Sequence, residues 1–263
     1  MDKIIGLGNA LVDVLATLKD DTLLDEMGLP KGSMQLIDDA KLQQINTKFS
    51  QMKTHLATGG SAGNAILGLA CLGAGTGFIG KVGNDHYGDF FRKNLQKNNI
   101  EDNLLTSEQL PSGVASTFIS QDGERTFGTY LGAAASLKAE DLTLEMFKGY
   151  AYLFIEGYLV QDHEMILHAI ELAKEAGLQI CLDMASYNIV ENDLEFFSLL
   201  INKYVDIVFA NEEEAKAFTG EEPEEALRVI AKKCSIAIVK VGANGSYIRK
   251  GTEEIKVSAI PVE

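Results

Sequence analysis

The feature that most constrains the fold is a regular alternation of short apolar runs and longer amphipathic segments in the second half of the sequence. The strand-like runs lie at about 151–155, 178–183, 205–209 and 235–240. Roughly 25–30 residues separate one run from the next, which is enough for a crossover helix. A strand–helix–strand series of this kind predicts a parallel sheet with helices on both faces, and therefore an α/β fold.

The carboxyl ends of these four strands carry residues suited to ligand binding. In open α/β sheets, ligands lie beyond the carboxyl ends of the strands. The residues that arrive there are Glu156, Asp183, Asn211 and the pair Val241-Gly242. We therefore expect this edge of the sheet to bind a ligand.

Two segments at that edge allow both a structural and a functional interpretation. Asn211 follows an apolar run, with Glu214 three residues later. This spacing is typical of a capping box at a helix N-terminus. Alternatively, Asn211 and Glu214 hold a hydrated Mg²⁺ and, through it, phosphate oxygens. The segment Lys240–Gly245 ends a strand and begins a hairpin, so it is either a plain turn or a loop that faces a nucleotide.

In the first half, three glycines fall within Gly59-Gly60-Ser61-Ala62-Gly63-Asn64. Glycine lets the backbone adopt positive φ and approach a ligand closely. An apolar helical run follows, from Ala65 to Leu72, and ends at Gly73. A glycine-rich turn before a helix offers backbone N–H groups and a favourable dipole to a polar ligand. The structural alternative is a tight turn that caps the helix.

The N-terminal residues read as two strands, 4–8 and 11–16, with a polar break at Asn9. Asp13 lies in the apolar second strand, where an unpaired carboxylate is costly. It is therefore either paired internally or an acceptor for ligand hydroxyls. A short helix, a turn and an amphipathic helix from about Asp39 follow within residues 20–52. Residues 113–131 alternate as a hairpin around the turn 121–124.

Single positions argue against two common nucleotide motifs. Gly6-x-Gly8 lacks the third glycine of a dinucleotide fingerprint, because Leu11 occupies that position. Gly75 to Val82 nearly matches a Walker A loop, but Val82 stands where Ser or Thr must reach Mg²⁺.

Composition excludes further classes. A content of 46% hydrophobic and 23% charged residues is that of a globular protein. The net charge of −15 argues against nucleic-acid binding, which needs an excess of Lys and Arg. The three cysteines form no C-x-x-C pair and indicate reduced thiols in a cytoplasmic protein. We see no signal peptide, no membrane span and no metal spacing among the four histidines.

Several motifs together resemble the ribokinase (pfkB-type) family of sugar and nucleoside kinases, and the resemblance covers essentially the whole chain. Gly123-Glu124-Arg125-Thr126, followed by Leu131-Gly132-Ala133-Ala134, looks closest to the adenosine-kinase-like branch. The other motifs are Asn9-x-x-x-Asp13, Gly59–Asn64, Gly80-Lys81-Val82-Gly83-Asn84-Asp85-x-x-Gly88, Asn211-x-x-Glu214 and Lys240-x-Gly242-x-x-Gly245.

The resemblance implies a three-layer α/β sandwich with a mostly parallel central sheet and a small β lid. Residues 1–263 would form a single kinase domain, with the lid built from about 14–38 and 113–131. The implied reaction transfers the γ-phosphoryl group of ATP, with Mg²⁺, to a primary hydroxyl of a nucleoside or sugar. Lids in this family pair or stay free, so the resemblance leaves open a homodimer through the lid.

The resemblance also implies roles for individual residues. The substrate-binding residues would be Asn9, Asp13, Gly59, Gly60, Asn64 and Arg125. The nucleotide-binding residues would be Asn211, Lys240, Gly242 and Gly245, and Glu214 would serve the metal.

One departure from the family concerns catalysis. The family's second signature, a run like Asp-Thr-x-Gly-Ala-Gly-Asp, supplies the anion hole and the catalytic base. In this register it should follow Pro261-Val262, and the sequence stops at Glu263. We therefore expect no catalytic residue within residues 1–263, and no activity from these residues alone. The alternative function is a non-catalytic protein that binds a sugar or nucleoside.

Overall fold

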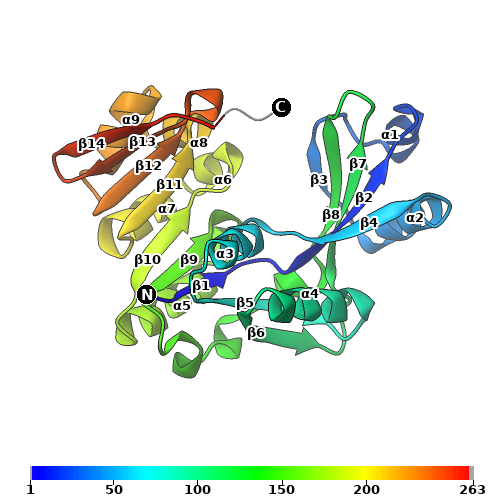
Figure 1. Ribbon diagram of the computed structural model, residues 1–263, viewed down its shortest axis with the longest axis horizontal. Coiled ribbons are helices and arrows are strands. Elements are labelled where there is room, and N and C mark those ends of the chain that lie inside the picture. The colour runs from blue at the N-terminus through cyan, green and yellow to red at the C-terminus, as the bar shows by residue number, and fades with distance from the viewer. Residues whose placement is uncertain (1, 261–263) are drawn as a thin grey trace. The chain divides into compact units, whose positions relative to one another are not determined.

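The computed structural model describes residues 2–260, which form two compact units (Figure 1). Unit 1 comprises the chain up to Gly8, then Gly73–Gly77, and the chain from Lys138 onward. Unit 2 comprises Asn9–Leu72 and Phe78–Leu137. Both segments that the sequence analysis assigned to the lid therefore lie in unit 2.

The larger sheet has nine strands in the order β14-β13-β12-β11-β10-β9-β1-β5-β6. Strand β1 pairs in parallel with β9, and β9, β10, β11 and β12 pair in parallel in that order. Strand β13 pairs antiparallel with both β12 and β14. The strands of unit 1 are β1 (Ile4–Leu7), β9 (Tyr152–Glu156), β10 (Gln179–Asp183), β11 (Ile207–Asn211), β12 (Ile236–Lys240), β13 (Ser246–Lys250) and β14 (Glu253–Val257). The four strands that the spacing predicted are therefore confirmed as β9 to β12.

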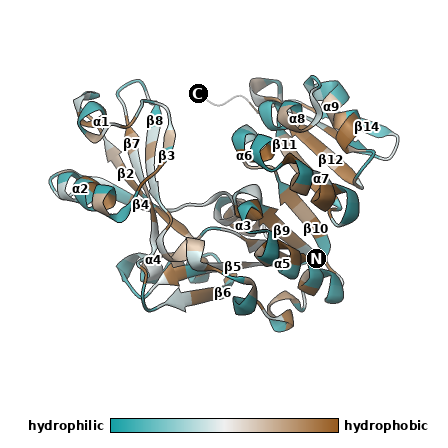
Figure 2. Cartoon of the chain, turned by 180° about the vertical axis from the view of Figure 1, so that it is seen from behind, coloured by the Kyte–Doolittle hydropathy of each residue, from teal (hydrophilic) through white to brown (hydrophobic). Residues whose placement is uncertain are grey.

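Five α-helices of unit 1 connect or follow these strands. They are α5 (His163–Glu175), α6 (Tyr187–Asn192), α7 (Leu194–Lys203), α8 (Glu212–Thr219) and α9 (Pro223–Ile230). Figure 2 shows hydrophobic residues concentrated in β10, β11 and β12. Helix α9 begins at Pro223, whose missing N–H costs nothing at a first helical position, and buries Ala226, Leu227 and Ile230. The arrangement is a three-layer α/β fold with a mostly parallel sheet, as expected.

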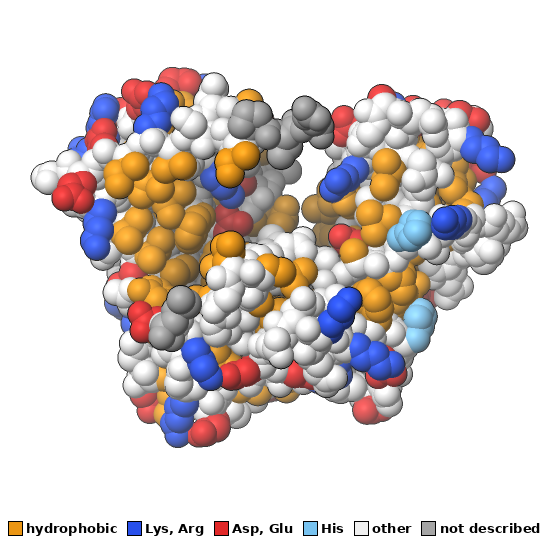
Figure 3. Space-filling model, in the orientation of Figure 1, with side chains coloured by type: hydrophobic (Ala, Val, Ile, Leu, Met, Phe, Trp, Pro, Cys, Tyr) orange, Lys and Arg blue, Asp and Glu red, His pale blue; other side chains and the backbone are white. Residues whose placement is uncertain are grey.

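One face of this sheet keeps apolar side chains in contact with solvent. Strand pairing places Phe209, Ile238, Ile248 and Ile255 in one cross-strand row, so they share a face. Ile255 is 57% exposed, and Val257 on the same strand is 45% exposed. Figure 3 shows hydrophobic side chains gathered over β11 to β14.

Unit 2 contains a separate five-stranded sheet in the order β3-β8-β7-β2-β4. Its strands are β2 (Leu11–Thr17), β3 (Met34–Leu36), β4 (Thr54–Thr58), β7 (Gly113–Ile119) and β8 (Arg125–Tyr130). The β7–β8 pair confirms the predicted hairpin. Strand β4 lies outside the segments that the sequence analysis assigned to the lid.

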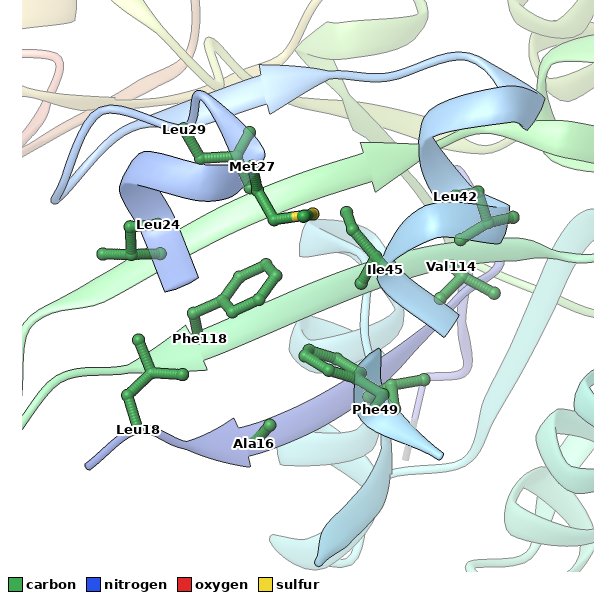
Figure 4. Close-up of a cluster of buried hydrophobic side chains, with 11 residues drawn as sticks. Ala16, Leu18, Leu24, Met27, Leu29, Leu42, Ile45, Phe49, Val114 and Phe118 are labelled. Atoms are coloured by element: carbon green, nitrogen blue, oxygen red, sulfur yellow. The ribbon is translucent and has the colours of Figure 1, made fainter. Parts of the chain in front are cut away.

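Two helices, α1 (Thr22–Met27) and α2 (Asp39–Phe49), pack on one face of the five-stranded sheet (Figure 4). Val14 and Ala16 point into this cluster, so alternate residues of β2 such as Asp13 lie on the opposite face. Phe49 and Phe118 meet edge to face, with ring centroids 4.9 Å apart. These contacts fix the orientation of β2 and so determine which face carries Asp13.

The rest of unit 2 comprises α3 (Ser61–Cys71), β5 (Thr76–Gly83, whose first two residues belong to unit 1), α4 (His86–Lys97) and β6 (Ile100–Ser107). The expectation that the helix after the glycine-rich stretch starts near Ala65 is wrong. Gly60 is the N-cap, with φ of 82°, and Ser61 to Asn64 already form the first turn of α3. Among residues 2–260, no helix combines the length and the apolar character needed to cross a bilayer.

Candidate functional site

Asp13 is a half-buried carboxylate on the face of the five-stranded sheet opposite the helices. Across residues 2–260, its side chain makes no hydrogen bond or ion pair. Burial raises the pKa of Asp13 to about 6, and the positive charge of Arg125 opposes that rise. A carboxylate that loses hydration without gaining a partner is ready to accept hydrogen bonds from ligand hydroxyls.

The cross-strand neighbours of Asp13 form a continuous row on the same face. Asp13 lies opposite Ala57 of β4 and Ala115 of β7. Ala115 in turn pairs with Thr129 of β8, which pairs with Leu36 of β3. We call this set, Ala57, Asp13, Ala115, Thr129 and Leu36, the Asp13 row. Ala57 is exposed and leaves its side of the carboxylate open, whereas Ala115 is only 5% exposed.

A cleft of about 340 Å³ lies at the β3 end of the Asp13 row. Leu36, which is 64% exposed, and Thr129 contribute to it from the row itself. Its other lining residues are Ile37, Leu110, Tyr130, Leu131 and Gly132. The row thus joins a polar acceptor to a mainly apolar cleft. The sequence analysis did not identify Leu36 or Thr129; the alternation Met34-x-Leu36 after the Gly32 turn was the available signal.

The glycine-rich stretch packs against Asn9 and Asp13. A Cβ atom at Gly59 would overlap the carboxylate of Asp13, and one at Gly60 would overlap the carbonyl oxygen of Asn9. Gly60 also has a positive φ that disfavours other residues. Asn64 lies in the first turn of α3 with an exposed side chain. The structure thus brings Asn9, Asp13, Gly59 and Gly60 together.

Arg125 lies on the same face of the sheet as Asp13 but in a different row. It pairs with Ile119, which pairs with Thr17 of β2. Thr17 is four residues from Asp13 on β2, a separation of about 13 Å along the strand. The Arg125 backbone therefore lies well along the sheet from Asp13, and its positive charge still acts on the Asp13 carboxylate.

In unit 1, the strand ends bring the second set of candidate residues together. Asp183 pairs with Glu156, and Asn211 pairs with Lys240. Lys240 Nζ lies 3.5 Å from Asp183 Oδ1. Burial raises the pKa of Tyr158, as do the negative charges of Glu156, Glu214 and Asp183. The expected edge of polar residues at the carboxyl ends of the strands is therefore present.

Asn211 and Glu214 form a complete capping box at the start of α8. The Asn211 backbone N–H donates to Glu214 Oε2 at 2.7 Å, and Asn211 Nδ2 donates to Oε1 at 2.8 Å. The Glu214 N–H returns a bond to Asn211 Oδ1 at 2.8 Å. Glu214 is only 2% exposed, and burial raises its pKa. The capping box predicted from the sequence is thus confirmed.

The glycines of the β12–β13 turn differ in their surroundings. A Cβ atom at Gly242 would meet nothing within 4 Å, so space is open there. At Gly245 it would overlap the carbonyl oxygen of Val257, and Gly245 also has φ of 92°. Gly245 is thus required for the packing of β14, whereas Gly242 leaves its side open.

The described residues form no cluster of protein metal ligands at this edge. Among residues 2–260, no group of three or more His, Cys, Asp or Glu side chains could hold a metal ion. Both oxygens of Glu214 already accept a bond from Asn211. Mg²⁺ usually keeps several waters, so a water-mediated contact with Glu214 is compatible with the capping box.

A family profile decides the relationship of this chain to known proteins. The profile described as pfkB family carbohydrate kinase matches residues 32–263. This chain belongs to the pfkB family. The expected family is therefore confirmed.

Individual pfkB relatives agree. The chain is 26% identical to the guanosine-inosine kinase of Escherichia coli (strain K12) over 95% of its own length, and it spans 61% of that relative. A protein described as a probable sugar kinase from Rhizobium etli CFN 42 has a TM-score of 0.87 and 32% identity, with 99% of this chain and 80% of that one covered. The adenosine kinase from Sinorhizobium meliloti has a TM-score of 0.86 and 31% identity, with 100% and 81% covered.

These relatives are nucleoside or sugar kinases, and they place the chain in the adenosine-kinase-like branch. They do not bear out the expectation that residues 1–263 are inactive. The position expected for the second signature follows Pro261 and Val262, which lie outside the described residues.

Proposed function

We propose that this protein transfers the γ-phosphoryl group of ATP to a primary hydroxyl of a nucleoside. The main support for this proposal is the Asp13 row. It has a carboxylate without a hydrogen-bond partner among the described residues, and one end of it lines a mainly apolar cleft. Sugar hydroxyls would donate to Asp13, and the base would lie toward Leu36 and the cleft. A free sugar would satisfy Asp13 but leave the cleft unfilled, so a nucleoside is the better match. The nucleoside kinases among the relatives, from Escherichia coli and Sinorhizobium meliloti, support this proposal.

The other candidate residues have supporting roles in this proposal. Gly59 and Gly60 keep the backbone close to Asp13 and Asn9, and Asn64 offers an exposed amide. Arg125 would meet a negatively charged part of the substrates. In unit 1, Asn211, Lys240 and Gly242 would face the nucleotide, where Lys240 can neutralise phosphate charge.

In the reaction, the substrate hydroxyl oxygen forms a bond to the γ-phosphorus while the bond to the bridging oxygen of ADP breaks. The proton of the hydroxyl goes to a general base, which we assign to none of the described residues. Mg²⁺, when bound, would neutralise phosphate charge, with Glu214 in contact through water.

A coupled ADP-release assay tests the proposal directly. The chain would be assayed with adenosine, guanosine, inosine and ribose, and substrate binding measured in parallel by calorimetry. We expect nucleosides to bind more tightly than ribose and to stimulate ADP release. Nucleoside binding without ADP release would favour the alternative, a non-catalytic nucleoside-binding protein. Absence of binding to the whole panel would refute both.

The variant Glu214→Gln separates the two interpretations of the capping box. Glutamine keeps only one of the two acceptors that the Asn211 backbone N–H and Nδ2 use, so we expect a loss of stability of about 1–3 kcal/mol with the fold retained. If Glu214 also serves the metal, the Mg²⁺ concentration needed for half-maximal ADP release should rise. An unchanged Mg²⁺ requirement would leave Glu214 with its capping role alone.

A further inference from the structure

Asp85 makes more hydrogen bonds than the cap of a helix requires. Its Oδ1 accepts from the backbone N–H groups of Tyr87 at 3.1 Å and Gly88 at 2.9 Å, as an N-cap of α4 does. Its Oδ2 accepts from the Ser112 N–H at 2.8 Å, and Oδ1 also accepts from Ser112 Oγ at 2.7 Å. Burial alone raises the pKa of Asp85, but the bonds from Gly88 and Ser112 outweigh it and lower that pKa.

Ser112 connects this cap to the end of β5. Its hydroxyl donates to Asp85 and accepts from the Gly83 N–H at 2.9 Å. A Cβ atom at Gly83 would lie 2.5 Å from Ser112 N and 2.7 Å from the Leu110 oxygen. One at Gly88 would overlap the Gly83 oxygen. The segment Gly83–Gly88, part of the Gly80–Gly88 family motif, is thus packed around Ser112, 27 residues from Asp85.

The next residue, Gly113, packs against Leu11, which lies on β2 close to Asp13. A Cβ atom there would lie 2.5 Å from Leu11 Cδ2 and 2.6 Å from the Leu131 oxygen. Gly113 also pairs with Leu11 in the β2–β7 register. The Leu11 carbonyl in turn accepts from the Gly59 N–H at 2.8 Å. Leu11 thus connects Gly113 to Gly59 and lies two residues before Asp13.

We propose that Asp85 is a positioning residue for substrate binding, acting through Ser112, Gly113 and Leu11 on Asp13 and Gly59. This inference rests on the proposed function, because it takes Asp13 to be the acceptor for substrate hydroxyls. An ionised Asp85 holds the start of β7 in one place. The start of β7 then fixes the start of β2, and with it the separation between the Asp13 carboxylate and the backbone of Gly59.

Asp38 offers a matched control within the same unit. It is the N-cap of α2, and its Oδ1 accepts from the Lys41 N–H at 2.8 Å. Within residues 2–260, Asp38 accepts no bond from Ser112 or from strands β2 and β7. A change of Asp38 to Asn therefore tests loss of a capping charge alone, whereas the same change at Asp85 also disrupts the bonds to Ser112.

The experiment compares Asp85→Asn, Ser112→Ala and Asp38→Asn in the 263-residue chain. Calorimetry would measure the Kd for adenosine and, separately, for ATP. We expect the first two variants to raise the Kd for adenosine by about tenfold or more, since a displacement of 1 Å can cost roughly a hundredfold. The Kd for ATP should stay within about twofold. Asp38→Asn should change neither constant.

Hydrogen exchange provides a measure that does not depend on the ligand. The Gly59 amide, which bonds to Leu11, should exchange faster in Asp85→Asn and in Ser112→Ala, but not in Asp38→Asn. Ser112→Ala keeps the Asp85 cap, so it remains informative if Asp85→Asn fails to fold. Unchanged adenosine affinity in a folded Ser112→Ala variant would overturn the proposal. If the wild type binds no adenosine while Gly59 exchange still responds, the proposed function fails and the anchoring of Gly59 stands.

Discussion

At the scale of single residues, the ionised Asp13 carboxylate lowers the stability of the fold but is the acceptor proposed for substrate hydroxyls. Its carboxylate is half-buried, and the described residues offer it no hydrogen bond. Its pKa of about 6 in the folded protein exceeds the ordinary value of 3.8. Between these two values the folded chain holds a proton that the unfolded chain has released. Folding stability therefore falls as the pH rises through this window and stays lower above it.

This sign leads to opposite effects of Asp13→Asn on stability and binding. At pH 7 the variant should be more stable than the wild type by about 1–2 kcal/mol, because it removes an unpaired buried charge. Its Kd for adenosine should rise more than tenfold, since a charge-assisted acceptor is worth about 1.5–3 kcal/mol. Thermal unfolding at pH 5 and pH 7, with calorimetry, would check both effects. A less stable variant at pH 7 would mean that Asp13 has a structural partner.

The same linkage predicts how binding depends on pH in the wild type. Substrate hydroxyls are expected to bind the ionised carboxylate, so affinity should be constant above pH 7. It should fall by about tenfold for each pH unit below 6, as the proton competes with the ligand. The Asn variant should lose this dependence. A flat profile in the wild type would exclude the ionised form of Asp13 from binding.

Ser116 presents a different cost, an unpaired hydroxyl within the core of unit 2. It is fully buried, and its Oγ has no hydrogen-bond partner among residues 2–260. Ser116→Ala should therefore raise stability by about 1 kcal/mol, seen as a higher Tm. Ser120→Ala is the matched control, because Ser120 Oγ donates to Asp21 Oδ1 at 2.6 Å. That control should lose stability instead; a loss in both variants would indicate an unrecognised partner for Ser116.

At the scale of elements, two glycines in and before α3 have different surroundings. Gly59 lies just before the helix and has no room for a Cβ, because the Asp13 carboxylate occupies that space. Gly68 lies inside the helix, where a Cβ would meet nothing within 4 Å. The first glycine is required by packing around the candidate site, and the second is not.

This contrast gives a matched pair of substitutions. Gly68→Ala should stabilise the protein by about 0.5–1 kcal/mol, because alanine lowers the entropy cost of forming the helix. Adenosine binding should not change. Gly59→Ala should displace Asp13 and weaken adenosine binding by more than about tenfold. Melting curves and calorimetry on both variants would decide the matter. Equal affinities for the two variants would argue that Gly59 has no role in the site.

At the scale of the whole molecule, the candidate residues divide by unit. Every residue assigned to substrate lies in unit 2, and every residue assigned to the nucleotide or the metal lies in unit 1. In the proposed function, the five-stranded sheet and the glycine-rich stretch would bind the nucleoside, and the strand ends of the parallel sheet would bind the nucleotide.

The exposed apolar face over β11 to β14 should govern the solubility of the 263-residue chain. Exposed apolar patches of this kind favour association, despite the net charge of −15. Ile255→Thr keeps β propensity while removing apolar surface, so it should lower light scattering at high concentration. Adenosine affinity should not change, because Ile255 is not among the residues assigned to adenosine. Unaltered scattering would show that another surface causes the association.

The sequence by itself determined the elements that local periodicity encodes. The strands β9 to β12 and the β7–β8 hairpin follow from apolar patterns within a few residues. The polar edge at Asp183 and Asn211 follows as well, because parallel strands align their carboxyl ends. The capping box at Asn211 and Glu214 was also readable, since both partners lie within four residues.

Only the tertiary structure decided which distant residues meet. Whether Asp13 is paired inside the protein depended on β4 and β7, which lie about 40 and 100 residues away in sequence. Leu36 joined the Asp13 row through pairing with Thr129. Asp85 looked like part of a motif, but its bonds to Ser112 became visible only in three dimensions. Cross-strand pairs and buried carboxylates are defined by non-local packing, which local sequence patterns do not record.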